Sequence, residues 1–189
     1  MTQEKNKTGQ TARQSKAVSK HSDGRNNNQG ERKDKLRIIP LGGLEEVGRN
    51  MTVFEYGDDI IIVDCGLMFP EEKMMGIDYI IPNTKYLKNK KKKIRGVIIT
   101  HGHYDHIGAI PQIIPELGNP PVYATELTRG IIMKRQEEYK DQAPINVKKI
   151  RKIDKLKLGA FGVDFFHVNH SIPDAVGLLI RTLVGNIMH

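Results

Sequence analysis

A chain of 189 residues with 38% hydrophobic residues can bury a substantial core, so we expect one globular unit. No apolar run approaches the roughly 18 residues of a membrane-spanning helix, and the polar N-terminal region lacks the apolar segment of a secretory signal. We therefore expect a cytoplasmic protein without a membrane partner. The formal net charge of +8 suits a polyanionic partner but says nothing about chemistry.

Half of the positive excess lies in residues 1–34, where eight basic side chains stand against four acidic ones. This segment is rich in Gln, Asn, Ser, Lys and Gly and is almost free of aliphatic side chains. It cannot bury enough surface to offset the entropy of ordering, so we expect a disordered basic tail. A basic arm for RNA and an ordinary solvated tail both fit this composition.

The pattern changes at Lys35, after which short β-branched runs alternate with turn residues. Five lysines between Lys88 and Lys93 indicate an exposed loop or helix end rather than a binding site. A helix is expected over 107–117, with Pro111 in or near its first turn, and another over 126–139. Strands alternating with two helices predict a mixed α/β layered domain over 35–189. The expected strands are 36–41, 51–56, 60–63, 94–100, 122–124, 147–153, 162–168 and 177–182.

The single cysteine, Cys65, cannot form an internal disulfide. It lies inside an apolar, strand-like run, which indicates a small buried hydrophobic side chain. A reactive thiol is the less favoured alternative, because no activating base stands nearby in the sequence.

The segment His101-Gly102-His103-Tyr104-Asp105-His106 holds three of the seven histidines and directly follows a predicted buried strand. Imidazole nitrogens and carboxylate oxygens are the ligands that zinc and similar divalent ions prefer. An i, i+2 pair followed by an i+4, i+5 pair can face two adjacent metal ions from one loop. We therefore expect a metal site here, against the alternative of a polar loop with incidental histidines.

This pattern, His-x-His-x-Asp-His after a strand, resembles the second motif of the metallo-β-lactamase superfamily. The resemblance implies the N-terminal part of an αββα sandwich. It also implies that Asp64, in Ile62-Val63-Asp64-Cys65-Gly66, orients the ligand loop without binding metal. His170 matches the third motif and would join His101 and His103 on one metal, while His167 is expected to point elsewhere.

Further segments resemble the ribonuclease J family from about Leu36 to His189. They are the stretch Leu41 to Asn50, Met68-Phe69-Pro70-Glu71-Glu72, Gly76 to Pro82, and His170-Ser171-Ile172-Pro173-Asp174. The resemblance implies two Zn²⁺ ions per site, with other divalent ions as alternatives. It implies that Asp105, which also has a catalytic role, and His106 bind the second ion. It further implies hydrolysis of RNA phosphodiester bonds, both 5′-to-3′ exonucleolytic and endonucleolytic, and a homodimer or homotetramer.

One residue departs from the family pattern. Glu45 stands where family members usually carry a small residue, often glycine, which affects a turn but no ligand. The family's fourth motif, a Thr-Gly-Asp with a bridging aspartate, would follow the strand that resembles 185–189. Because the sequence ends at that strand, we expect a fragment, truncated before the fourth motif and lacking the family's β-CASP domain and C-terminal region, that is inactive by itself. A naturally short protein is the less favoured alternative, because it would leave a sheet edge uncovered.

Two other functions use much of the same pattern. A small-molecule hydrolase of the glyoxalase or lactamase type would carry the same second motif. A non-catalytic subunit of an RNA-degrading complex would carry an eroded site, against which the complete set of His101, His103, Asp105 and His106 argues.

Overall fold

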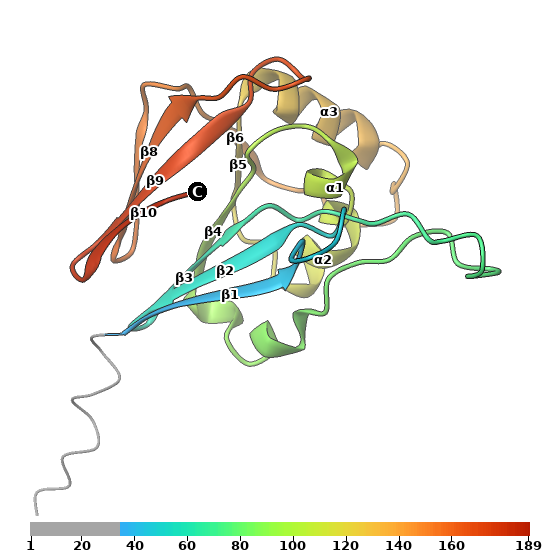
Figure 1. The fold of residues 1–189 in the computed structure, drawn as a ribbon, viewed down its shortest axis with the longest axis horizontal. Helices are drawn as coiled ribbons and strands as arrows, with labels where there is room; N and C mark the ends of the chain where they lie inside the picture. Colours follow the sequence, from blue (N-terminus) through green and yellow to red (C-terminus); the bar gives the residue numbers. More distant parts are fainter. Residues whose placement is uncertain (1–34) are drawn as a thin grey trace, which may run out of the picture.

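The computed structural model describes residues 35–189, and the tail predicted over 1–34 lies outside the described residues. Two β-sheets pack face to face, and the helices cover the outer face of the larger sheet (Figure 1). The larger sheet has the strand order β1-β2-β3-β4-β5-β6, antiparallel from β1 to β3 and parallel from β3 to β6. Its strands are β1 (Leu36–Gly42), β2 (Met51–Tyr56), β3 (Asp59–Val63), β4 (Ile94–Ile98), β5 (Val122–Ala124) and β6 (Val147–Lys149).

The smaller sheet is antiparallel, with the order β10-β9-β8-β7. The helices are short and fall between the parallel strands of the larger sheet, as expected for crossover connections. Within the described residues, no helix is both long and apolar enough to cross a bilayer. The remaining elements are β7 (Lys155–Leu158), β8 (Phe161–His167), β9 (Val176–Thr182), β10 (Gly185–Met188), α1 (Tyr104–Ile107), α2 (Ile110–Glu116), α3 (Glu126–Gln136), and the 3₁₀ turns η1 (Thr84–Leu87) and η2 (Lys91–Lys93).

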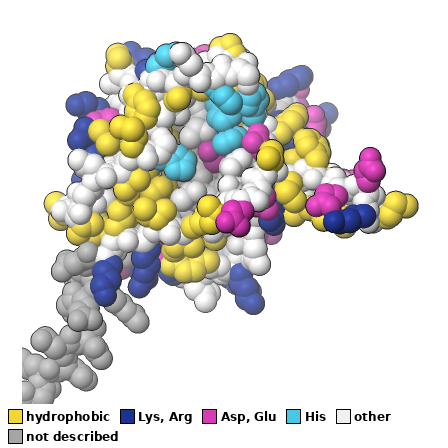
Figure 2. Space-filling model, in the orientation of Figure 1, with side chains coloured by type: hydrophobic (Ala, Val, Ile, Leu, Met, Phe, Trp, Pro, Cys, Tyr) yellow, Lys and Arg dark blue, Asp and Glu magenta, His cyan; other side chains and the backbone are white. Residues whose placement is uncertain are grey.

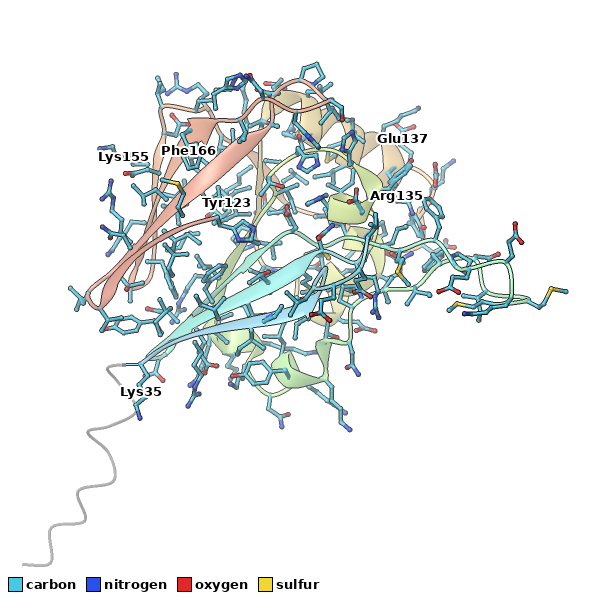
Figure 3. The ribbon with its side chains drawn as sticks, viewed as in Figure 1. Lys35, Tyr123, Arg135, Glu137, Lys155 and Phe166 are labelled. Atoms are coloured by element: carbon cyan, nitrogen blue, oxygen red, sulfur yellow. The ribbon has the colours of Figure 1, made fainter. Side chains whose placement is uncertain are left out.

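The alternation of side chains along the central strands creates two separate cores. In β3, Ile60 and Ile62 face the helices, whereas Ile61 and Val63 face the second sheet. Successive side chains of a strand point to opposite faces, so a central strand buried on both sides is apolar throughout. Figure 3 shows Tyr123 of β5 on the inner side, where it belongs to the core between the sheets. The described residues thus form helix, sheet and sheet layers, which confirms the predicted α/β layered class and the partial sandwich.

Most predicted elements are confirmed, with boundaries moved by one to three residues. The helix predicted over 107–117 is wrong as one piece, because the chain bends at Gly108-Ala109 and forms α1 and α2 separately. Pro111 lies in the first turn of α2, as expected. The strand predicted over 147–153 ends at Lys149, and β7 was not predicted, since its sequence Lys-Leu-Lys-Leu carries a charge at every second position.

The lysine-rich stretch forms a 3₁₀ turn, but Lys90 departs from the expected solvent exposure. Its ammonium group lies 2.8 Å from Oε2 of the buried Glu55, and the Tyr86 hydroxyl bonds the same carboxylate oxygen. Burial raises the pKa of Glu55, but the hydrogen bonds from Lys90 and Tyr86 outweigh burial and lower this pKa overall. The pKa of Lys90 is raised, because the same partners outweigh its own desolvation.

Replacing Lys90 with methionine is expected to lower the free energy of unfolding by about 2 to 3 kcal/mol, because the buried Glu55 carboxylate loses its closer cation and keeps only Arg37, at 3.9 Å. Urea denaturation measures this change, with the exposed Lys92→Met as the matched control. The Glu55 contribution is present above its unfolded pKa of about 4.3 and is lost as pH falls through the lower folded value. The Lys90 contribution is present below about 10.4 and is lost as pH rises through the higher folded value. Equal free energies of unfolding for Lys90→Met and Lys92→Met would contradict a stabilising ion pair between Lys90 and Glu55.

Candidate metal centre

The histidine-rich loop is held in place by three backbone hydrogen bonds from two neighbouring segments, residue 50 and residues 65–67. The loop leaves the buried strand β4 and turns through α1. A β-carbon on Gly66 would come within 1.6 Å of the carbonyl oxygen of Asp105, so only glycine permits this close approach. The three bonds are Leu67 N to Tyr104 O (3.1 Å), Asn50 N to Asp105 O (3.0 Å) and Cys65 N to His106 O (2.8 Å).

Asp64 lies beneath this loop at the end of β3 and is buried. Its Oδ1 accepts hydrogen bonds from the backbone N of Thr100 (2.8 Å) and from the Thr100 hydroxyl (3.0 Å), and its Oδ2 lies 2.7 Å from Nδ1 of His106. The backbone of Asp64 has a φ of +62°, a conformation that aspartate tolerates better than most residues. The structure therefore places Asp64 where it can orient the loop, separate from the converging imidazoles.

Three imidazoles converge at the open end of the loop. Nδ1 of His103 lies 3.1 Å from Nε2 of His101 and 3.2 Å from Nε2 of His170. His170 comes from the loop between β8 and β9. The start of β9, where this loop ends, is joined to the residue before the histidine-rich loop by the bond from Val176 N to Thr100 O (3.0 Å). Figure 2 shows the histidine side chains gathered on one face, next to acidic side chains.

These two separations fit ligands of a divalent metal ion, and the ligand nitrogens of all three histidines lie within 4.8 Å of one another. Two nitrogen ligands at about 2.0–2.1 Å from a tetrahedral zinc ion lie roughly 3.3 Å apart. One imidazole nitrogen offers a single lone pair or a single N–H, so Nδ1 of His103 cannot pair fully with two partners at once. Among residues 35–189, the group formed by His101, His103 and His170 is the one set of three potential ligands that lies close enough to hold an ion.

Asp105 and His106 form a second, smaller group beside the three imidazoles. Oδ2 of Asp105 lies 3.3 Å from Nε2 of His106, and the His106 ring centroid lies 4.0 Å from that of His101. The five residues expected to bind metal are therefore brought together as a set of three and an adjacent set of two. Their assignment to two metal sub-sites stays a prediction.

The protonation of the ring nitrogens suits this arrangement. Thr100 has one hydroxyl hydrogen, so donation to Asp64 leaves its oxygen to accept from Nδ1 of His101 at 2.9 Å, which frees Nε2 of His101. Burial, aided by repulsion from His106, lowers the pKa of His101 to about 4, so this ring is neutral near pH 7. Burial also disfavours charge on His106, but the hydrogen bond and charge of Asp64 raise its pKa overall.

His167 and Cys65 lie apart from the converging imidazoles. The Nδ1 of His167 is 2.9 Å from Nζ of Lys152, and its Nε2 is 3.1 Å from Asn169, which agrees with the expectation that it points elsewhere. Cys65 is fully buried, as predicted, and burial raises the pKa of its thiol far above the ordinary range.

The sequence reasoning missed Asn50, whose amide nitrogen lies 3.1 Å from Oδ2 of Asp105 and 3.3 Å from Nε2 of His106. Its position directly before β2, at the end of the family-like stretch Leu41 to Asn50, was the available signal. The contact between residues 50 and 105 depends on the tertiary fold, and a local sequence pattern does not predict contacts between residues so far apart in the chain.

Glu45, noted as a departure from the family pattern, has a φ of +58°. A side chain in this left-handed conformation costs roughly 1–2 kcal/mol, which glycine avoids. Glu45→Gly is expected to raise the free energy of unfolding by about 1 kcal/mol and to leave metal affinity unchanged. Chemical denaturation checks this, with Glu72→Gly, an exposed position without a positive φ, expected to be neutral or destabilising. Destabilisation by Glu45→Gly would contradict this account.

Comparison with known proteins identifies the fold family. The family model described as the metallo-beta-lactamase superfamily matches residues 44–181. The chain belongs to the metallo-β-lactamase superfamily. The metallo-β-lactamase fold protein YhfI from Bacillus subtilis aligns with it at a TM-score of 0.51 and 20% identity, covering 81% of this chain and 61% of that one. This structural likeness agrees with the layered fold described above.

Curated relatives within the metallo-β-lactamase superfamily are more similar in sequence. Ribonuclease J of Thermus thermophilus is 42% identical over 167 residues, covering 85% of this chain. Ribonuclease J of Mycoplasma pneumoniae is 40% identical over 156 residues, covering 82% of this chain. The chain spans only 29% and 27% of the length of these two relatives.

Proposed function

We propose that this chain carries metal ligands of an RNA phosphodiesterase of the ribonuclease J type. The convergence of His101, His103 and His170, with Asp105 and His106 beside them, is the observation that carries the proposal. Many hydrolases share such a site, so the site by itself does not choose the substrate. RNA is favoured because curated relatives 42% and 40% identical to this chain are named ribonuclease J.

In this proposal the two groups of ligands hold two divalent ions, preferably zinc. Such ions lower the pKa of water and offset negative charge at a scissile phosphate. The chain's own residues fix the ligands: Thr100 directs Nε2 of His101 outward, and Asp64 holds the Nδ1 proton of His106. The buried position of His101 keeps its ring neutral and available at physiological pH.

The remaining predictions concern how RNA is attracted and cleaved, where the protein is located and how it assembles. The net charge of +8 favours the approach of a polyanion such as RNA, and this attraction weakens as salt rises. Mixed exonucleolytic and endonucleolytic cleavage, a cytoplasmic location, a homodimer or homotetramer, and the inactivity of residues 1–189 alone all stay predictions.

The test measures hydrolysis of four substrates by two proteins: the complete product of the gene that encodes this chain, and the chain alone. Labelled RNA, DNA of the same sequence, the lactam nitrocefin and the thioester S-lactoylglutathione are incubated with and without EDTA. We expect the gene product to cleave RNA, leave 5′-phosphate ends and lose activity when EDTA removes the metal, and we expect the chain alone to be inactive. Hydrolysis of the lactam or thioester without RNA cleavage would overturn the proposal, as would RNA cleavage insensitive to EDTA.

A further inference from the structure

The segment from Thr84 to Lys93, which holds both 3₁₀ turns, contains six lysines and no acidic residue. Two of these lysines have acidic partners elsewhere in the fold: Lys90 pairs with the buried Glu55, and Nζ of Lys93 lies 3.0 Å from Asp58. The other four side chains are exposed, and within residues 35–189 their ammonium groups form no ion pair or hydrogen bond. They are Lys85, Lys88, Lys91 and Lys92. The described part of the chain therefore leaves four neighbouring positive charges without a counter-charge.

Three of these lysines lie along one groove. Lys85, Lys88 and Lys91 recur at every third residue of a backbone that turns tightly, as the bond from Lys88 N to Lys85 O (3.3 Å) shows. Side chains three residues apart face the same way in such a backbone. All three line a surface cavity of about 440 Å³, which we call the lysine groove; its other lining residues are Thr84, Glu116 and Leu117.

The charge of the lysine groove suits a chain of phosphates. Glu116 is the one acidic residue in its lining, and this carboxylate accepts a hydrogen bond from the Thr84 hydroxyl (3.4 Å). Three ammonium groups against one carboxylate leave the groove positive. Lysine acts as a flexible point charge rather than as a fixed fork, so a row of lysines suits repeated phosphates better than one closely held anion. Such rows are typical of sequence-independent contact with a nucleic-acid backbone.

The lysine groove and the metal centre lie at opposite ends of β4. The turn η2 leads directly into β4, and the histidine-rich loop follows the other end of this strand (Figure 1). His101 comes eight positions after Lys93, and an extended chain rises about 3.3 Å per residue, so the two sites are on the order of 25 Å apart. Phosphates of a stacked strand are about 3.4 Å apart, so an RNA needs on the order of seven nucleotides to reach both sites. The groove can therefore contact only RNA that extends well beyond the metal centre.

We propose that the lysine groove is a docking surface for the phosphate backbone of RNA that extends beyond the metal centre. The choice of RNA among polyanions rests on the proposed function, whereas the positive groove itself does not. Composition alone favours an ordinary solvated loop for this stretch; the groove and the unpaired ammonium groups are what the structure adds. Docking at the groove holds a long RNA near the metal centre without reading its sequence.

Binding of RNA to the complete gene product, measured by fluorescence anisotropy in EDTA, tests the proposal without cleavage. The probe is an unstructured, labelled RNA of about 20 nucleotides, long enough to reach both sites, titrated at several salt concentrations. The groove variant combines Lys85→Gln, Lys88→Gln and Lys91→Gln. Each phosphate contact contributes about 0.7 to the salt slope of a single strand, so the slope is expected to fall by about 2. The affinity near about 0.1 M salt is expected to fall on the order of 10- to 100-fold.

A second triple variant, with the same net charge as the groove variant, is the matched control. It changes to glutamine three exposed lysines that lie outside the groove lining and form no ion pair within the described residues: Lys140, Lys155 and Lys157. Its affinity is expected to stay within about threefold of the parent, because exposed charges distant from the RNA are screened by salt. Arginine at the three groove positions is expected to preserve binding, since the charges remain.

RNA length distinguishes docking at the groove from contact at the metal centre. In the metal-loaded gene product, the groove variant is expected to raise KM for the long RNA about tenfold and to leave kcat within about twofold, because it removes binding remote from the cleaved bond. For a trinucleotide, KM is expected to stay unchanged, since this substrate cannot reach both sites. Urea denaturation shows that each variant is folded.

The outcomes separate the groove from the proposed function. An unchanged salt slope in the groove variant, an equal loss in the control, or an equal rise in KM for the trinucleotide would overturn the proposal. Poly-glutamate that loses binding in the groove variant while RNA does not would assign the groove to an acidic protein and would overturn it too. A reduced slope in a gene product that cleaves no RNA would remove the proposed function and leave the docking surface standing.

Discussion

His101→Ala is expected to weaken Zn²⁺ binding on the order of 100- to 1000-fold, because it removes one of three converging imidazoles. Four-ligand zinc sites have apparent binding free energies of about 10–16 kcal/mol, so one ligand accounts for roughly 3 kcal/mol. His101 is also the most buried of the three, which limits replacement of its nitrogen by bulk water. Competition with a chromophoric chelator measures the change.

His167→Ala is the matched control for this experiment. His167 lies in the same region of the chain as His170, but its ring nitrogens face Lys152 and Asn169. Zinc affinity is expected to stay within about twofold of the parent chain, because no converging nitrogen is lost. Similar losses in His101→Ala and His167→Ala would mean that zinc binds elsewhere.

Asp64→Ala is expected to lower the free energy of unfolding by about 3 to 5 kcal/mol. The change leaves the Thr100 N–H and hydroxyl and Nδ1 of His106 without their buried acceptor. It also places alanine at a φ of +62°, which adds strain. Because the ligand loop loses its anchor, zinc affinity is expected to fall as well.

Two further variants separate the causes of this effect. Asp64→Asn keeps a residue that tolerates the left-handed backbone, so it is expected to retain more stability than alanine while still weakening the bond to His106. Asp164→Ala removes a carboxylate that pairs with Arg181 near the surface, and is expected to cost at most about 1 kcal/mol. A cost for Asp64→Ala no greater than that for Asp164→Ala would contradict the anchoring role. Urea denaturation of the metal-free proteins gives all three values.

The sequence predicts the larger sheet well because its strands are both β-branched and buried. The run Ile60-Ile61-Ile62-Val63 is short, β-branched and flanked by turn residues, so a strand is the favoured interpretation and a helix is not. Its alternate side chains fill the two cores. Prediction is weaker where burial is partial, as in β7, whose lysines face solvent. The bend at Gly108-Ala109 was also missed, because the apolar pattern continues across it.

The sequence predicts which residues form the candidate site, but it does not predict the hydrogen bonds that hold them in place. His101, His103, Asp105 and His106 are adjacent in the chain, so residue type and spacing sufficed to select them. Their supports come from residues 50 and 64–67, and these contacts arise only when β2, β3 and β4 lie side by side. The half-buried Lys90 shows the same limit, since its partner Glu55 is 35 residues away.

The most direct test of the metal centre is an anomalous difference map, measured at the zinc edge, from crystals of the chain grown with Zn²⁺. We expect the strongest peak about 2.0–2.1 Å from Nε2 of His101, Nδ1 of His103 and Nε2 of His170. A strongest peak at any other group of side chains, or no peak at these nitrogens with zinc bound in solution, would contradict the account.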